Sequence, residues 1–311
     1  MIDHFLWVEK YRPKTVAECI LPAELKKTFQ AFVDQKNIPH LQLSGGAGMG
    51  KTSVARAMVE EIGCDYIMIN GSKDGNIDTL RTTIQNFAST MSFKGGRKYV
   101  ILDEADYLTH HTQPALRNFM EEFSRNCGFI LTCNYPNRII EPLWSRNSCI
   151  AFHIVKEEIP QLAMEFFHRV KHILGQENVE YDKAAVVDLI KKHFPDFRRT
   201  LNELQRHAAK GKITGDILQH AISIESLVKH MKEKNFTSVR QWTTENLNGD
   251  SSELYRNFYD DAAELFTPDY IPMLVLTLAK YQYQASFALD QEINFAAFCA
   301  EIMVEASWKR K

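Results

Sequence analysis

Short apolar runs alternate with amphipathic stretches along the first half of the chain. Five runs have the length of buried strands and lie at 41–43, 65–70, 99–102, 129–133 and 148–154. Between them apolar residues recur at helical spacing, as at Leu116, Phe119, Met120 and Phe123. Strands that alternate with helices predict an α/β domain with a five-stranded parallel sheet and a site at the carboxyl ends of its strands.

The pattern changes after residue 155, beyond which no strand pattern is expected. Helical periodicity predicts helices at 159–174, 182–192 and 197–209, a fourth from Gly215-Asp216, and more from about 225, one of them over 290–308. We therefore predict three domains: a sheet domain (1–154), a small helical domain (155–224) and an all-helical domain (225–311). The aromatic residues of the last domain are predicted to form either a monomer core or a subunit interface: Phe258, Tyr259, Phe266, Tyr270, Tyr281, Tyr283 and Phe287.

Residues 7–13, WVEKYRP, are predicted to form an ordered turn and not a helix, because Pro13 restricts Arg12 to an extended conformation. One interpretation is an N-terminal arm that packs on the core. The other is a wall of a pocket for an adenine base, which needs flat apolar surfaces. The residues proposed for that wall are Tyr11, Arg12, Pro13, Val16 and Ile20.

The segment GGAGMGKT, residues 45–52, fits the P-loop motif, with an apolar strand before it and an amphipathic helix after it. Glycines let backbone N–H groups surround phosphate oxygens, and the helix N-terminus adds a partial positive charge. We expect Lys51 to reach the β- and γ-phosphates of ATP and the Thr52 hydroxyl to hold Mg²⁺. The segment expected to bind the nucleotide comprises Gly45, Gly46, Ala47, Gly48, Met49, Gly50, Lys51, Thr52 and Ser53.

The apolar run at 99–102 ends in Asp103-Glu104, about 50 residues after the P-loop lysine. Adjacent carboxylates at the end of an apolar strand are costly unless a cation satisfies them. We expect Asp103 to hold Mg²⁺ and Glu104 to take the proton from the attacking water; the alternative is a surface turn. Asn134 ends the next strand and either orients that water or is a turn residue before Tyr135-Pro136.

Composition limits the classes of partner. The net charge is −2 and the pI about 6.6, so nucleic-acid binding requires a local basic patch. Residues 225–311 carry 9 Lys and Arg against 13 Asp and Glu, which disfavours them as a DNA-facing surface. Six scattered cysteines without a C-x-x-C pair argue against a zinc module or a disulfide framework and favour free thiols in a reducing cytoplasm. We expect no signal peptide, membrane span or membrane partner.

Seven segments occur in a fixed order along nearly the whole chain: WVEKYRP, the P-loop, LDEAD, ALRNFMEEFS, ILTCN, EPLWSR and FPDFRRTLNEL. Together they resemble the small-subunit type of sliding-clamp loader in the AAA+ ATPase family, in the compact version of T-even-type bacteriophages. The resemblance implies a DNA-stimulated ATPase that opens a ring-shaped clamp and loads it onto primer–template DNA. It implies as partners the clamp, the DNA, and a hetero-pentameric ring of copies of the chain with one smaller subunit, joined by the last domain as a collar.

The resemblance also assigns residue roles. Lys51 and Thr52 correspond to Walker A, Asp103 and Glu104 to Walker B, and Asn134 to sensor 1. Arg198 resembles sensor 2, which reaches the γ-phosphate from the helical lid, and Arg146 resembles the arginine finger that completes a neighbouring subunit's site. The sequence departs from the family pattern at Asn147, where the family usually has Cys, and at Gly46-Ala47, where it usually has Pro-Pro. Taken alone, an arginine such as Arg146 is usually a solvated side chain.

Three basic residues after or near the loops of the first domain, Lys73, Arg81 and Arg117, are expected either to touch DNA phosphates or to form a solvated face. Phe123 ends an apolar stripe, and the resemblance directs it to the clamp, whereas its spacing is also typical of a core residue. The alternative functions are an AAA+ helicase or helicase loader and a non-hydrolysing ring scaffold. Glu104, Asn134 and Arg146 together disfavour the scaffold, and WVEKYRP favours the clamp loader over the helicase.

Overall fold

The computed structural model describes residues 5–73, 77–92, 95–209, 211–213, 224–247 and 251–309. The chain forms two compact units, residues 1–218 and 219–311. The fourth helix expected from Gly215-Asp216 lies outside the described residues.

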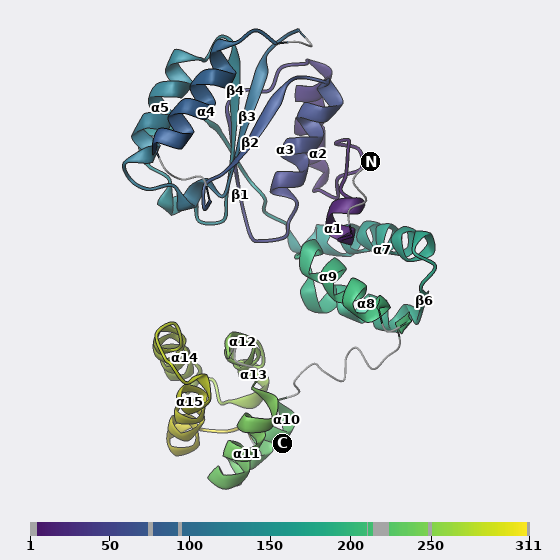
Figure 1. Cartoon of the computed structure of the whole chain (residues 1–311). Helices are drawn as coiled ribbons and strands as arrows, with labels where there is room; N and C mark the ends of the chain where they lie inside the picture. The colour runs from purple at the N-terminus through teal and green to yellow at the C-terminus, as the bar shows by residue number, and fades with distance from the viewer. Residues whose placement is uncertain are drawn as a thin grey trace. The chain divides into compact units, whose positions relative to one another are not determined.

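The first unit is built on a parallel sheet with the strand order β2-β3-β4-β1-β5, which confirms the predicted fold class (Figure 1). Since β1 and β3 both pair with β4, the P-loop strand and the acidic strand are separated by a single strand. The strands are β1 (Leu41–Ser44), β2 (Tyr66–Asn70), β3 (Lys98–Asp103), β4 (Cys127–Cys133) and β5 (Ser148–Ala151).

Helices cover both faces of this sheet (Figure 1). The side chains of β3 alternate between the two faces: Ile101 packs with helices α2 (Ala23–Asp34) and α3 (Lys51–Ile62). Leu102 packs with α4 (Ile77–Ser89) and α5 (Thr112–Glu122). Because helices cover both faces, successive residues of a strand are all buried, and such strands appear as continuous apolar runs in the sequence.

The chain then passes through α6 (Glu141–Trp144) into a helical lid made of α7 (Ile159–Gln176), α8 (Lys183–His193) and α9 (Phe197–Ala208). Asp182 and Asp196 cap α8 and α9, since their side chains accept hydrogen bonds from backbone N–H groups of the first turns. The expectation of no strand in this region is wrong, because β6 (Glu180–Tyr181) pairs with β7 (Lys212–Ile213). A pairing of two residues is too short to leave a periodic pattern.

The N-terminal segment contains a one-turn helix, α1 (Trp7–Lys10), which corrects the prediction that residues 7–13 form no helix. Pro13 restricts only Arg12, so it leaves the residues upstream free to be helical. Tertiary contacts stabilise the turn: Trp7 is buried in the core of the lid, and its backbone N–H donates to Gln205 Oε1 over 3.0 Å. This arm therefore packs on the lid.

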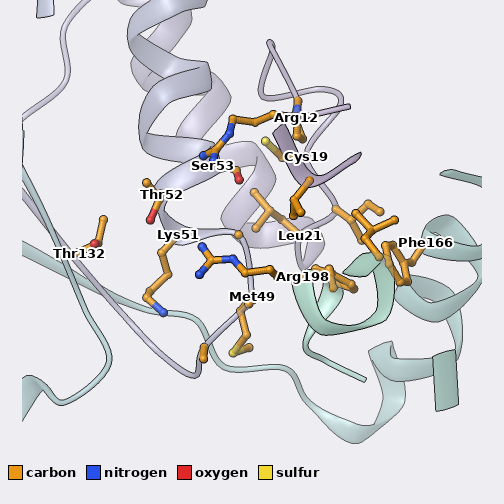
Figure 2. A pocket seen from close by; sticks show the side chains of 18 of the residues that line it. Arg12, Cys19, Leu21, Met49, Lys51, Thr52, Ser53, Thr132, Phe166 and Arg198 are labelled. Carbon is orange, nitrogen blue, oxygen red and sulfur yellow. The ribbon is translucent and has the colours of Figure 1, made fainter. Parts of the chain in front are cut away.

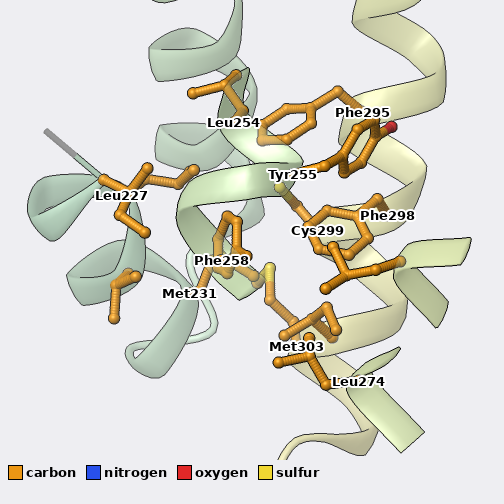
Figure 3. Packing of buried hydrophobic residues seen from close by; sticks show 14 of the residues in the cluster. Leu227, Met231, Leu254, Tyr255, Phe258, Leu274, Phe295, Phe298, Cys299 and Met303 are labelled. Carbon is orange, nitrogen blue, oxygen red and sulfur yellow. The ribbon is translucent and has the colours of Figure 1, made fainter. Parts of the chain in front are cut away.

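The second unit is all-helical and comprises α10 (Glu225–Lys232), α11 (Phe236–Asn246), α12 (Ser252–Asp260), α13 (Ala262–Leu265), α14 (Ile271–Ala285) and α15 (Gln291–Glu305). Aromatic rings fill its core, where Phe298 meets Tyr255 and Phe258 edge to face (Figure 3). The seven aromatic residues singled out from the sequence divide between core and surface. Phe258, Phe266, Tyr270 and Tyr281 are buried, and Tyr259, Tyr283 and Phe287 are exposed.

We expect Leu274→Ala to lower the free energy of unfolding of the second unit by about 2–5 kcal/mol, because it leaves a cavity in the core. Leu276→Ala removes the same atoms from a side chain of the same helix that is 66% exposed. Its effect on the free chain should stay within about 0.5 kcal/mol. Urea denaturation followed by the fluorescence of buried Trp242 measures both effects. Equal effects of the two changes would contradict the structure, in which Leu274 is buried in the core of the second unit and Leu276 is exposed.

Candidate functional site

The P-loop joins the end of β1 to the start of α3, and its conformation requires glycine at positions that include Gly48 and Gly50. Gly50, the residue before α3, has φ of +89°, and Gly48 has φ of +72°, both in the left-handed region. A Cβ on Gly48 would also lie 1.7 Å from Asp196 Oδ1, at the start of lid helix α9. Residues 47–53 line the cavity beneath the lid, at a helix N-terminus that favours an anion.

Lys51 is 7% exposed, and its ammonium group lies at the centre of the site. Its Nζ donates to the carbonyls of Gly45 and Gly46, over 2.8 and 2.6 Å, and to Asn134 Oδ1 over 2.8 Å. Burial lowers the pKa of Lys51, while the negative charge of Asp103 opposes this lowering. The predicted phosphate-binding lysine and the predicted water-orienting asparagine are thereby brought into direct contact.

Asp103 accepts two hydroxyl hydrogen bonds at the end of β3. Its Oδ1 receives Thr52 Oγ1 at 2.6 Å and Thr132 Oγ1 at 2.5 Å. A hydroxyl and a carboxylate in contact are the oxygen ligands that Mg²⁺ takes in nucleotide sites, so the residues present fit this ion. Glu104 follows and lines the same cavity.

Sequence reasoning missed Asp106 and Thr132. Asp106 is 4% exposed, and its Oδ2 accepts the backbone N–H groups of Asn134 and Tyr135 over 3.2 and 3.0 Å. It therefore orients the segment that carries Asn134. The sequence offered a signal for Asp106, which is the third acidic residue of the segment Asp103-Glu104-Ala105-Asp106. It offered none for Thr132, because threonine is a common residue inside a strand.

One cavity joins these groups to the lid and the N-terminal arm, enclosing about 1150 Å³ with the open space at its mouth (Figure 2). Tyr11, Arg12, Pro13 and Ile20 line it, whereas Val16 is fully buried in the core behind the wall. The proposed base pocket is therefore completed by side chains that the sequence did not indicate. These are Val8, Cys19 and Leu21 from the arm, and Phe166, Ile173, Phe197 and Leu201 from the lid. Apolar walls beside a cationic loop fit a purine nucleotide.

Two lid arginines reach the cavity. Arg198, in the first turn of α9, points toward the P-loop, and its charge adds to the lowering of the pKa of Lys51 (Figure 2). Arg169 of α7 donates to the carbonyl of Glu18 over 2.6 Å and to that of Tyr11 over 3.3 Å. Tyr11 Oη in turn donates to Glu177 Oε1 over 2.6 Å. These bonds hold the arm to the lid beside the proposed base pocket.

The remaining predicted residues lie outside this cavity. Arg146 follows α6, donates from Nε to Glu121 Oε1 over 2.7 Å and from Nη1 to the carbonyl of Pro142 over 2.9 Å. Lys73 and Arg81 are exposed, and Arg117 Nε lies 3.8 Å from Glu121 Oε1. Phe123, at the end of α5, is half-buried against the core of the sheet domain.

A P-loop on a central strand, an acidic pair one strand away and a helical lid lining the same cavity define an ATPase of the AAA class. Residues 41–157 match the family described as ATPase family associated with various cellular activities. Residues 159–219 match the AAA+ ATPase lid domain of the sliding-clamp-loader large subunit.

Three similar proteins extend the match over the chain. The sliding-clamp-loader large subunit of Enterobacteria phage T4 is 33% identical over 99% of this chain and 98% of its own length. That of Escherichia phage RB69 is 38% identical over 76% of each protein. The replication factor C small subunit of Staphylothermus marinus is 33% identical over 97% of this chain and 95% of its own. The chain belongs to the sliding-clamp-loader subunits of the AAA ATPase family, which act in DNA replication.

Among solved structures, the RuvB Holliday junction branch migration motor of Thermotoga maritima resembles the chain with a TM-score of 0.54. The match covers 83% of this chain and 93% of that one at 18% identity, and it shows a shared fold alone. Within the part of the chain that the structure describes, no helix is both long and apolar enough to cross a bilayer.

We expect Arg169→Leu to weaken ATP binding about tenfold, because it removes two hydrogen bonds from a charged group that hold the arm beside the base pocket. Lys171→Leu, at an exposed position of the same helix, is the matched control and should leave the dissociation constant unchanged. Titration with a fluorescent ATP analogue measures both constants. Equal affinities of the two variants would show that the arm needs no anchoring by Arg169.

Proposed function

We propose that the chain hydrolyses ATP to open a sliding clamp and place it on primer–template DNA. The observation that carries this proposal is the contact between Lys51 and Asn134 beside the Thr52–Asp103 pair, all in one cavity with Glu104 and Arg198. Such a set supplies a phosphate clamp, metal ligands, a base and a water-orienting amide together. A protein that only bound nucleotide would have no need for the last two.

Each residue has a role in this proposal. Lys51, the loop amides and Arg198 hold the phosphates, and Thr52 with Asp103 holds Mg²⁺. When bound, Mg²⁺ neutralises charge that develops on the phosphate oxygens. Glu104 takes the proton from the attacking water. The Asn134 side chain, which accepts a hydrogen bond from Lys51, orients that water, and Asp106 holds the backbone N–H of Asn134. The arm and the apolar side of the lid hold the adenine.

We expect Glu104→Gln to leave ATP binding intact and to lower turnover by about 10²–10⁴-fold, because it removes the base and keeps the shape of the side chain. Lys51→Ala should instead weaken binding itself. Turnover is measured in the assembled loader, with clamp and primer–template DNA added singly and together, and stimulation by both together is expected. Near-normal turnover of Glu104→Gln would show that Glu104 is not the base.

The proposal includes a ring of copies of this chain with one smaller subunit. The second unit exposes large apolar side chains on α14, on α15 and between them, which favours contact with a neighbouring subunit. These residues are Met273, Leu276, Tyr283, Phe287, Leu289 and Ile293. Lys73, Arg81 and Arg117 are proposed to touch DNA phosphates, and Phe123 the clamp.

Arg146 is proposed to complete the site of a neighbouring subunit. It lies outside the lining of its own cavity, and its partner is the half-exposed carboxylate of Glu121. An ion pair at such a surface stabilises by only about 0–1 kcal/mol, so Arg146 exchanges Glu121 for a phosphate at little cost. Asn147, in the place of the usual cysteine, donates to the carbonyl of Leu143 over 2.6 Å and so caps the short helix before Arg146.

We expect Arg146→Ala to keep ATP binding and to lower turnover by about 10³–10⁵-fold in the ring, because a guanidinium delivered from outside stabilises the charge of phosphoryl transfer. A mixture of Arg146→Ala with Glu104→Gln subunits should regain part of the turnover, at junctions where an intact finger meets an intact base. ATPase assays with co-assembly checked by native mass spectrometry measure this. A mixture that is as inactive as its components would exclude action on the neighbour.

A further inference from the structure

The backbone of Glu104 has an unusual conformation. Its φ and ψ are +55° and +44°, in the left-handed region that residues with a side chain rarely adopt. The residue lies directly after β3 and lines the cavity. Because the backbone angles fix the direction of the Cα–Cβ bond, this conformation limits where the Glu104 carboxylate can point. Such a conformation persists only where surrounding groups determine it.

The first of these groups is Thr132, which comes from the neighbouring strand β4 and is 2% exposed. Its hydroxyl donates its hydrogen to Asp103 Oδ1 over 2.5 Å and accepts the backbone N–H of Glu104 over 3.2 Å. A hydroxyl has one hydrogen to give and lone pairs to accept, so both bonds form at once. Thr132 lies across the cavity from the N-terminal arm, on the side of Lys51 and Thr52 (Figure 2). The Thr132 hydroxyl oxygen is therefore bonded both to the carboxylate of Asp103, the proposed metal ligand, and to the backbone of Glu104, the proposed base.

The second group is Gly71, which follows β2 on the other side of β3. Its N–H donates to the carbonyl of Asp103 over 2.8 Å. A Cβ added to Gly71 would lie 2.5 Å from the carbonyl oxygen of Glu104 and 3.2 Å from its carbonyl carbon. The neighbouring atoms are backbone atoms, which cannot rotate away as a flexible side chain would. Any residue other than glycine at this position therefore displaces the peptide group of Glu104.

We propose that Thr132 and Gly71 are positioning residues that hold the Glu104 backbone in its left-handed conformation and so aim its carboxylate at the attacking water. The two act from opposite sides of β3, one through a hydrogen bond and the other through the space left by a missing side chain. The inference rests on the proposed role of Glu104 as the base. It adds two residues that act on the reaction without touching the nucleotide's reacting atoms.

Thr132→Val keeps the shape of the side chain and removes the hydroxyl, whereas Thr132→Ser keeps the hydroxyl. In the assembled loader, with clamp, DNA and Mg²⁺ at the concentration that saturates the wild type, Thr132→Val should lower kcat at least about tenfold and up to about 10²-fold, as misplacement of a catalytic group does. Its dissociation constant for ATP should remain unchanged, and Thr132→Ser should restore most of the turnover. If excess Mg²⁺ restores the kcat of Thr132→Val, Thr132 acts only by holding Asp103, and its proposed role toward Glu104 is wrong.

Gly71→Ala leaves every hydroxyl in place and tests the same conformation independently. It should also lower kcat about tenfold or more without changing ATP affinity. Gly175→Ala in α7, where an added Cβ meets no atom within 4 Å, is the matched control and should retain turnover. Crystal structures of Thr132→Val and Gly71→Ala should show Glu104 outside the left-handed region. Wild-type kcat with φ still near its present value would overturn the proposal.

The two levels of hypothesis are separated by including Glu104→Gln in the same assay. If Glu104→Gln is inactive while Thr132→Val and Gly71→Ala turn over normally, Glu104 remains the base and the positioning role is wrong. If Glu104→Gln itself turns over normally, the proposed role of Glu104 fails, and the positioning role fails with it.

Discussion

The carboxylate of Asp103 connects the two halves of the nucleotide site. Its Oδ1 receives Thr52, from the helix that begins at the P-loop, and Thr132, from the strand that separates β1 from β3. Asp103 is half-buried, and the two hydroxyls satisfy this carboxylate oxygen in the place of water. The same bonds fix the phosphate-binding loop relative to the acidic pair.

The opposite wall of the cavity is built from segments that are distant in the sequence. The N-terminal arm shares its apolar core with the lid, through Trp7, and is tied to α7 by Arg169 and Glu177. The P-loop belongs to the sheet, and it meets the lid where Gly48 approaches Asp196. The cavity is thus lined by two groups of elements, the sheet with its loops and the lid with its arm, and a bound nucleotide would contact both. A ligand that binds one arrangement of the lid and the sheet more tightly than another shifts the equilibrium toward that arrangement.

The second unit shows how one aromatic-rich sequence serves both a core and a surface. Tyr281 and Tyr283 are two residues apart on α14, so the helical repeat places them on different faces. Tyr281 is buried and donates to Glu301 Oε2 over 2.8 Å, whereas Tyr283 is 71% exposed. The sequence left core and interface open for all seven aromatic residues. The packing of α14 against α15 decides which of Tyr281 and Tyr283 is buried, because only the partner helix defines which side of α14 is inward.

The sequence alone was sufficient for the class of fold, the order of the five sheet strands along the chain, and the position of the P-loop and of the acidic pair that follows the third strand. These features are local: a motif of eight residues, an apolar run that ends in two carboxylates, and periodicities within single elements. Other features arise where segments far apart in the chain meet. The helical turn of the arm depends on Trp7, which lies in the core of the lid. Val16 packs in the core of the sheet domain and does not line the cavity. The apolar wall contributed by the lid, and the left-handed Glu104 held between Thr132 and Gly71, depend on strand order and helix packing. No local pattern encodes which strands become neighbours, and for that reason the tertiary structure alone decided them.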